Sequence, residues 1–357
     1  MPTIVIPKEI APGESRAAMT PLLMKRLRDL HLEIKIESGL GAGIFAADSA
    51  YQCEIIADKA ALYAYGDIVI KVQPPMAEEV VLMKEGAVVI SFLYPYLDPE
   101  MVKKMATKKI TALAMELIPR ISRAQDMDAL SSQATIVGYK AVLIAANACR
   151  FFFPMLTTAA GTIKPARVLV IGAGVAGLQA IAIARRLGAM VSAYDVRPDT
   201  KQQVESLGAK FLDVGVAAGD SGGYARELTA EEKAQQQQVL AKHLATQDVV
   251  IATAGVPGKL APKIITSAMV EAMKPGAVIV DAMAEMGGNC ELARAGETIL
   301  YHDVQIIGAK NIVSSLAVNA SEMYARNVLN VLNLVVKNGK IAIDLEDEII
   351  KNCRVEL

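Results

Sequence analysis

Short apolar runs alternate with amphipathic stretches along the first 120 residues of the chain. The runs TIVIPKE, LEIKIE, DIVIKVQ, AVVISFLY and KITALAM are short and rich in Val and Ile, which predicts β-strands. Helical patterns lie between them. The first passes through LLMKRLRDL, with Thr20 expected at the N-cap and Pro21 as the first helical residue. Strands that alternate with helices predict a parallel sheet covered on both faces.

The same alternation returns in the second half of the chain. A long helical pattern from about Ala134 to Phe153 is followed by a Gly/Thr-rich linker, TTAAGTIKPA. Six further strand-like runs come next: ARVLVI, MVSAYD, AKFLD, DVVIATA, AVIVDAM and VQIIG. Another long helix is expected from about Asn319 to Asn338. These patterns predict an α/β protein with two domains, which is also the natural expectation for 357 residues.

Composition excludes several classes of function. The net charge of −1 leaves no basic field that would attract nucleic acid. The four cysteines are far apart and form no CxxC pair, so we predict neither a metal site nor a disulfide framework. The longest weakly polar run, VLVIGAGVAGLQAIAIA, contains a glutamine and three glycines, and no other stretch approaches about 18 apolar residues. We therefore expect no direct membrane span.

A glycine motif in the second domain predicts a dinucleotide site. Residues 167–195 read RVLVIGAGVAGLQAIAIARRLGAMVSAYD, in which a strand runs into Gly172-x-Gly174-x-x-Gly177, then a helix, then a strand that ends at Asp195. The first glycine permits the tight turn, the second lets the backbone approach the pyrophosphate, and the third lets helix and strand pack closely. Asp195 can accept both ribose hydroxyls and would repel a 2′-phosphate, which favours NAD(H) over NADP(H).

Other residues are expected to line the same nucleotide. Arg197 could pair a 2′-phosphate, although a solvated arginine is the preferred interpretation. Ala254-Gly255 follows a strand at the carboxyl end of the sheet, and Pro257-Gly258 continues that turn. The segment AAGDSGGYARELT (217–229) is either a lid centred on Tyr224 or a passive surface loop. The predicted cofactor-binding set is completed by Val175 and Val196.

Few groups suited to proton transfer accompany this cofactor site. Oxidation of an alcohol or amine needs a general acid or base, and none of the three histidines lies in a loop after a strand of the first domain. Lys71 is a possible base, with an edge lysine as the equal alternative. Hydride transfer between two nicotinamide rings needs no acid or base, only that both C4 atoms lie about 3–3.5 Å apart.

Several stretches together resemble one enzyme family. They are IPKEIAPGESRAAMTP, IPRISRAQDMDALSSQA, GYKAV, TTAAGTIKPARVLVIGAGVAGLQAIAIARRLGA and DVRPDTKQQVESLGAKF. In combination they resemble the NAD(H)-binding component of the proton-translocating nicotinamide nucleotide transhydrogenases, over nearly the whole chain. The wider fold family includes alanine dehydrogenase, which shares the PKE…PGE.R…TP opening and the KVQ strand.

This resemblance implies a domain division and a function. Two Rossmann-like domains with parallel sheets are expected, with the nucleotide cleft between them: residues 1–132 with 319–357, and the NAD(H)-binding residues 133–318. The chain would transfer hydride from NADH to NADP⁺ held on a partner subunit, as a homodimer at the cytoplasmic face of a membrane. Since the chain ends at Leu357, the membrane-spanning and NADP(H)-binding parts are expected on separate polypeptides.

The resemblance also gives a role to the polar segment PRISRAQDMDALSSQ (119–133). Arg120, Asp128 and Ser131 would hold the nicotinamide carboxamide and ribose, and Gln125 would reach toward the NADP(H) of the partner subunit. A carboxamide, with one acceptor and two donor hydrogens, suits such a cluster. A polar interdomain linker without a ligand is the alternative.

Two departures bear on function. The catalytic histidine of alanine dehydrogenases aligns with Tyr94, and the aspartate of their VDxAxDxGG motif aligns with Glu285, while their substrate-binding arginine and lysine are present as Arg16 and Lys71. This makes an amino-acid dehydrogenase the alternative enzyme, and an NAD(H)-sensing subunit the non-enzymatic one. From the transhydrogenase pattern the chain departs at GAKNIVSSLAVNA (308–320), where a proline and an arginine are replaced.

Overall fold

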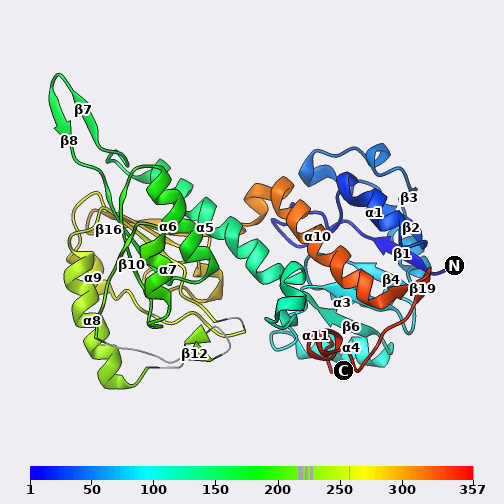
Figure 1. Ribbon diagram of the computed structural model, residues 1–357. Coiled ribbons are helices and arrows are strands. Elements are labelled where there is room, and N and C mark those ends of the chain that lie inside the picture. Colours follow the sequence, from blue (N-terminus) through cyan, green and yellow to red (C-terminus); the bar gives the residue numbers. More distant parts are fainter. Residues whose placement is uncertain (216–219, 222–223, 226–227, 257, 357) are drawn as a thin grey trace. The chain divides into compact units, whose positions relative to one another are not determined.

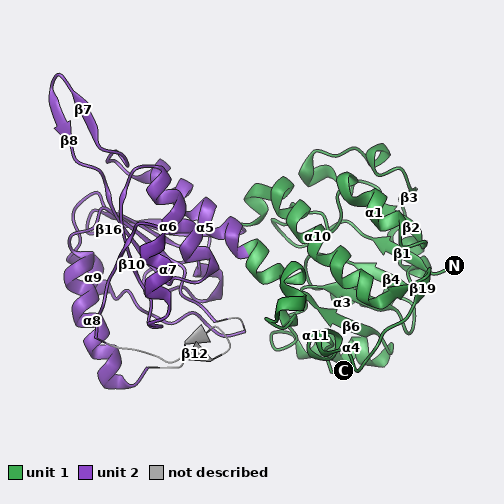
Figure 2. Cartoon of the chain, in the orientation of Figure 1, with its two compact units in different colours: residues 1–133, 313–357 green, residues 134–312 purple. Residues whose placement is uncertain are grey.

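The structure is a computed structural model that describes residues 1–356 except 216–219, 222–223, 226–227 and 257. The chain forms two compact units, residues 1–133 with 313–357 and residues 134–312 (Figure 2). The sequence placed the divisions at 132/133 and 318/319. Here the first falls after Gln133, inside a helix, and the second falls before Val313.

Unit 1 is built on a six-stranded sheet in which all neighbouring strands are parallel. Its order is β3-β2-β1-β4-β5-β6, the doubly wound order that reverses direction between β1 and β4. The five expected strands are confirmed. The additional strand β3 was not predicted, because it is a short edge strand whose residues are mostly exposed and give no apolar run. The strands are β1 (Thr3–Ile6), β2 (Glu33–Glu37), β3 (Glu54–Ile56), β4 (Ile68–Ile70), β5 (Val88–Ser91) and β6 (Thr111–Ala114).

The two faces of this sheet bury different helices, because successive side chains of a strand point to opposite faces. Ile4 and Ile6 pack in one cluster with the long helix α10 (Ala317–Val335), whereas Val5 packs in a second cluster on the other face. In Figure 1, α10 (orange) lies against strands from the beginning of the chain, so the end of the sequence completes the first unit. The other helices of the unit are α1 (Met24–Arg28), α2 (Lys59–Tyr65), α3 (Ala77–Leu82), α4 (Pro99–Thr107) and α11 (Glu348–Cys353).

The expected cap at Thr20 is only partly correct. Thr20 has an extended backbone directly before Pro21, as predicted, but the chain there opens as a 3₁₀ turn, η1 (Pro21–Leu23), ahead of α1. Within the described chain the buried Thr20 hydroxyl finds no hydrogen-bond partner. The fixed φ of proline, rather than a side-chain cap, therefore starts this turn.

Unit 2 repeats the same winding order. Its sheet runs β11-β10-β9-β14-β15-β17-β16 and reverses direction between β9 and β14. The first six strands are parallel, as predicted, and the unpredicted edge strand β16 pairs antiparallel with β17. The strands are β9 (Arg167–Ile171), β10 (Met190–Tyr194), β11 (Lys210–Phe211), β14 (Val249–Ala252), β15 (Val278–Asp281), β16 (Thr298–Tyr301) and β17 (Val304–Gly308), and the helices are α6 (Val175–Arg186), α7 (Thr200–Ser206), α8 (Ala230–Leu244) and α9 (Ser267–Glu271).

The segment that links the polar stretch to β9 differs from the sequence expectation. Helix α5 spans Ala129–Ala148, so it begins five residues before the predicted start at Ala134. Asp128 explains the early start, because its carboxylate accepts bonds from Ser131 N (2.8 Å) and Ser131 Oγ (2.6 Å), as an N-cap residue does. By length and composition α5 would be able to cross a membrane, a test that core helices of soluble proteins also pass. The expectation that no second stretch was apolar enough is therefore wrong.

The Gly/Thr-rich linker is also not a plain linker. Strands β7 (Leu156–Thr158) and β8 (Gly161–Ile163) pair antiparallel as a hairpin that projects from unit 2 (Figure 1). Five of its six paired residues are exposed, and Leu156 is partly buried. Without a buried face the strands leave no apolar alternation in the sequence, so the pattern could not predict them.

Candidate functional site

The glycine turn lies where the sheet of unit 2 changes direction. Ile171 ends β9, Gly172 takes a positive φ of 92°, and α6 begins at Val175 with Gly174 as its N-cap. In open parallel sheets, ligands bind outside the carboxyl ends of the strands at this switch point. The exposed Val175, a predicted contact, is the first residue of the helix.

Each glycine of the turn meets a different steric requirement. A Cβ on Gly172 would lie 2.8 Å from Ala254 N, and a Cβ on Gly177 would lie 1.7 Å from the carbonyl oxygen of Gly172. A Cβ on Gly174 would meet no heavy atom of the described residues within 4 Å, so this glycine faces open space. Tight packing at the first and third positions and open space at the second suit a cradle that a pyrophosphate approaches.

The acidic residue at the end of β10 is joined to this turn. Asp195 Oδ2 accepts a 2.7 Å bond from Ala173 N, inside the glycine motif. Arg197 folds back on the same carboxylate, with Nε 3.0 Å from Oδ1 and Nη2 3.0 Å from Oδ2. The interpretation of Arg197 as a solvated arginine is therefore wrong, because the largely buried Asp195 charge holds it as a partner. Val196, between them, packs partly against the core of unit 2.

The turn after β14 is held by a residue that the sequence did not indicate. Asn289 is fully buried, accepts a bond from Ala254 N (3.0 Å) and donates to the carbonyl oxygen of Ala254 (2.8 Å). Thr253 Oγ1 in turn donates to the carbonyl oxygen of Gly172 (3.0 Å). The predicted pair Ala254-Gly255 therefore lies beside the first glycine of the motif. The buried asparagine in MGGN was the signal that could have been found.

The rest of the predicted lid and turn lies largely outside the described residues. This applies to Pro257 and to much of segment 217–229. For Tyr224 the structure gives the backbone alone: β13 (Tyr224–Ala225) pairs antiparallel with β12 (Asp220–Ser221).

The switch point of unit 1 carries charged side chains instead of glycines. Lys71 follows β4, its side chain is 1% exposed, and its Nζ lies 3.3 Å from Glu9 Oε2 and 3.1 Å from Glu79 Oε1. Tyr63 OH donates to the same Glu79 oxygen at 2.8 Å. Burial raises the pKa of Glu9, and the Lys71 charge opposes that rise. The edge-lysine interpretation of Lys71 is wrong, because two carboxylates allow the ammonium to be buried.

Arg16 belongs to a second buried network beside it. Its guanidinium bonds Glu14 through Nε (2.8 Å) and Nη2 (2.6 Å), and its Nη1 donates to Gln133 Oε1 at 2.9 Å. Burial opposes ionisation of Glu14, but the bonds from Arg16 outweigh it and lower the pKa of Glu14 to about 2. Ser314, from the atypical segment 308–320, donates to the same carboxylate. That segment is therefore tied into unit 1.

Tyr94 and Glu285 occupy the positions of the dehydrogenase acid–base residues. Burial, followed by the charge of Glu116, raises the pKa of Tyr94 above its usual 10, so the phenol keeps its proton at neutral pH. Glu285 is exposed and accepts a 3.0 Å bond from Asn311 N. A neutral phenol does not replace a histidine as a proton acceptor near pH 7.

The polar segment forms a 3₁₀ turn, η5 (Ser122–Met127), ahead of α5. Ala124 and Met127 are buried in the core of unit 1, whereas Arg120 and Gln125 are exposed. Asp128 and Ser131 hold each other at the start of the helix. The segment therefore anchors itself by an apolar side and presents its polar side, which a featureless linker would not do.

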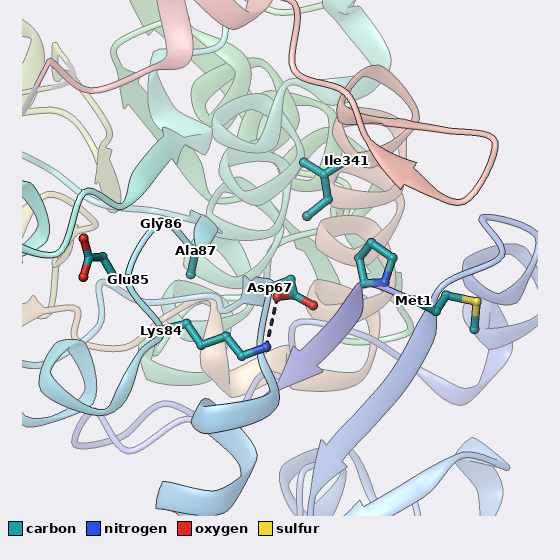
Figure 3. Close-up of a pocket in the computed structure, with 8 residues that line it drawn as sticks. Met1, Asp67, Lys84, Glu85, Gly86, Ala87 and Ile341 are labelled. Carbon is teal, nitrogen blue, oxygen red and sulfur yellow. Dashed lines mark hydrogen bonds and ion pairs between the residues drawn. The ribbon is translucent and has the colours of Figure 1, made fainter.

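A hollow at the opposite edge of the unit 1 sheet does not suit a nucleotide. Its lining includes Pro2, Asp67 and Ala87, which directly precede β1, β4 and β5 (Figure 3). It therefore lies at the amino ends of the strands, and the Lys84–Asp67 ion pair (3.0 Å) spans part of it. No glycine cradle or helix N-terminus is among its described lining residues.

Comparison with known proteins agrees with this geometry. The chain matches the N-terminal domain of the alanine dehydrogenase/PNT family over residues 5–137, and the C-terminal domain of that family over residues 141–355. The chain belongs to the alanine dehydrogenase/PNT family. It is 47% identical to an NAD(P) transhydrogenase alpha subunit of Rhodospirillum rubrum, over 97% of this chain and 94% of that protein.

Members of both branches of the alanine dehydrogenase/PNT family are similar to the chain. The NAD(P) transhydrogenase subunit alpha of Haemophilus influenzae is 42% identical, over 99% of this chain and 70% of that protein. A transhydrogenase structure from Sinorhizobium meliloti matches with a TM-score of 0.89 and 42% identity, over 99% of this chain and 97% of that one. An L-alanine dehydrogenase structure (TM-score 0.81, 22% identity, 99% and 94% covered) shows the shared fold. The resemblance drawn from the sequence and the α/β fold class are confirmed.

Proposed function

We propose that the chain is the NAD(H)-binding subunit of a proton-translocating transhydrogenase and transfers hydride from NADH to NADP⁺ held on a partner subunit. The observation that carries the proposal is the glycine turn of unit 2, in which Gly174 faces open space at a helix N-terminus. Asp195 lies within bonding distance of that turn, where it can accept ribose hydroxyls. The high identity to named transhydrogenase subunits supports the same assignment.

The chemistry needs positioning rather than proton transfer. Bound NADH supplies a hydride, and both electrons leave with it, so no side chain has to take up a proton in this step. Arg120, Asp128 and Ser131 would orient the nicotinamide carboxamide and ribose, and Gln125 would extend toward the NADP(H) of the partner subunit. Binding energy would be spent on bringing the two C4 atoms to about 3–3.5 Å.

The assembly implied by this role has three components. One is a homodimer of the chain, for which the exposed β7–β8 hairpin offers a projecting element. The others are a membrane-spanning subunit and an NADP(H)-binding subunit, with the chain peripheral at the cytoplasmic face. Proton translocation would take place in those partners.

An amino-acid dehydrogenase is the competing assignment. It would need a proton acceptor where this chain has the neutral Tyr94, and a substrate carboxylate would have to share Arg16 with Glu14. Both observations favour the hydride-only reaction.

Mixing the purified chain with an NADP(H)-binding partner domain tests the proposal. NADH and NADP⁺ should be converted to NAD⁺ and NADPH only when both proteins are present. The chain with alanine and NAD⁺ should produce no NADH. Activity on alanine would establish the dehydrogenase, and NADH binding without transfer in the mixture would establish a sensing subunit.

The role of Gln125 gives a sharper prediction. Gln125→Asn shortens the side chain by one methylene, and misplacement on the scale of 1 Å can slow such a step by ~10²-fold. Single-turnover transfer should slow steeply while NADH affinity changes little. Arg120→Ala should both weaken NADH binding and slow transfer. If Gln125→Asn lost NADH affinity as strongly as Arg120→Ala, Gln125 would be an ordinary cofactor ligand.

A further inference from the structure

Helix α10 holds the turn that carries Gln125 through one buried amide. We infer that Asn327 is a positioning residue for hydride transfer, which fixes η5 so that Gln125 reaches its target. This inference rests on the proposed function, and it assigns a role to a residue far from the glycine cradle in the sequence.

Asn327 joins the two ends of the polar segment. Its Nδ2 donates a 2.8 Å bond to the carbonyl oxygen of Asp126, the residue after Gln125. Its Oδ1 accepts a 2.7 Å bond from Ser132 Oγ, in the first turn of α5. The side chain is 6% exposed, so both bonds lie away from competing water. One amide therefore sets the spacing between the turn and the start of the helix.

Two further contacts hold the same turn less strongly. Asn330, one turn along α10, also donates to the carbonyl oxygen of Asp126 (3.0 Å), but this bond is exposed to solvent. Arg123 forms a two-bonded ion pair with Asp347, the N-cap of α11, at 2.8 and 3.1 Å, and half of its side chain is exposed. Because exposed polar contacts contribute little, the buried amide is expected to dominate.

The clamp extends into the buried charges of unit 1. Ser132 Oγ accepts a bond from Gln133 Nε2 (3.1 Å), and Gln133 Oε1 accepts the bond from Arg16. An unbroken hydrogen-bond chain therefore runs from the Glu14–Arg16 pair through Gln133, Ser132 and Asn327 to the Asp126 carbonyl. Arg16, which aligns with the substrate arginine of the dehydrogenases, supports the transfer segment here.

The test compares two variants of Asn327 with a neighbour. Asn327→Asp keeps the acceptor for Ser132 but removes the donor to Asp126, and Asn327→Ser removes the reach to both. Asn330→Ala is the control, because the same carbonyl keeps its bond from Asn327. Each is measured with the NADP(H)-binding partner domain in single-turnover transfer, together with NADH affinity and thermal unfolding.

Both Asn327 variants should slow transfer by about 10-fold or more, since displacement of a reacting group by ~1 Å can cost ~10²-fold. NADH affinity should stay within about twofold, because the contacts of the glycine cradle are in unit 2. Asn330→Ala should slow transfer by less than about twofold. Transfer at the unmutated rate in a folded variant, or equal slowing in Asn330→Ala, would overturn the inference.

A double-mutant cycle separates positioning from general damage. If Asn327 acts through Gln125, adding Asn327→Asp to Gln125→Asn should slow transfer far less than it does in the unmutated chain. Slowing that multiplies in the double variant would show an unrelated structural effect and refute the assignment. If the unmutated chain and partner show no transfer at all, the proposed function itself fails, which is a distinct result.

Discussion

The carboxylate of Asp195 combines two tasks within a few ångströms. It bonds the backbone of the glycine turn at Ala173 and is paired by Arg197. A bound ribose would add hydroxyl donors to the same oxygens, whereas a 2′-phosphate would meet a carboxylate in the way. Nucleotide choice therefore depends on which partners this one group can accept.

Asp195→Ala should weaken NADH binding by about 1–3 kcal/mol, the cost of leaving buried polar partners unpaired. Calorimetric titration measures this, with Arg197→Ala as the control, in which the acceptor oxygens remain and the loss should be smaller. The unmutated chain should bind NADH well and NADPH poorly. Equal affinity for the two nucleotides would contradict the NAD(H) assignment.

The Glu14–Arg16 pair makes stability depend on pH. The pKa of Glu14 is about 2 in the folded chain against 4.5 unfolded, so its contribution is full above pH 4.5 and is lost as pH falls toward 2. The difference corresponds to about 3 kcal/mol at neutral pH. Glu14→Gln should therefore destabilise the chain more at pH 7 than at pH 3. Urea unfolding at both pH values measures this, and an equal loss at each would show that the pair is not responsible.

At the scale of elements, the contact of α5 with α6 decides how the phosphate-binding turn is placed. Gly138 of α5 lies so close to the first turn of α6 that a Cβ there would be 2.1 Å from the carbonyl oxygen of Ala176. The neighbouring atom is backbone, which cannot move aside as a flexible side chain can. The glycine in GYKAV is thus a packing requirement of the cradle.

Gly138→Ala should cost about 1–3 kcal/mol of stability by overpacking and should also weaken NADH binding, because the N-terminus of α6 must shift. Asn147→Ala, an exposed position on the same helix, is the control and should change neither quantity. Denaturant unfolding and NADH titration give the two readings. A Gly138→Ala chain that kept both would show that α5 and α6 tolerate a wider spacing.

At the scale of the whole molecule, the β7–β8 hairpin is the element best placed to join two copies of the chain. It projects from unit 2 with mostly exposed strands, and the large apolar side chains of Met155 and Ile163 at its base are exposed (Figure 1). Exposed apolar side chains on a paired strand edge favour association with another protein surface.

Replacing residues 156–163 by a short Gly-Ser linker should convert a dimer of the chain into a monomer, with NADH binding retained because the cradle lies elsewhere. Sedimentation velocity gives the mass of each species. The control is Thr162→Ala, which removes only a 3.4 Å contact between exposed hydroxyls and should leave the dimer intact. A deletion variant that still sediments as a dimer would place the interface on another surface.

The sequence by itself determined the two α/β units, most strands and the glycine turn, because these depend on local patterns. Period-two apolar runs and a strand–glycine–helix junction are properties of neighbouring residues, and Gly172 and Asp195 are where the motif placed them. Elements without a buried face, such as β3 and β7–β8, left no such pattern.

Only the tertiary structure decided how the charged residues are used. From the sequence, Lys71 and Arg16 were interpreted as edge or substrate-binding groups, yet their partners Glu9, Glu79 and Gln133 are brought to them from other elements. Asn327 bonds Asp126 across a separation of 201 residues along the chain. Burial of a charge or an amide requires a partner, and partners at such separations are chosen by packing rather than by sequence pattern.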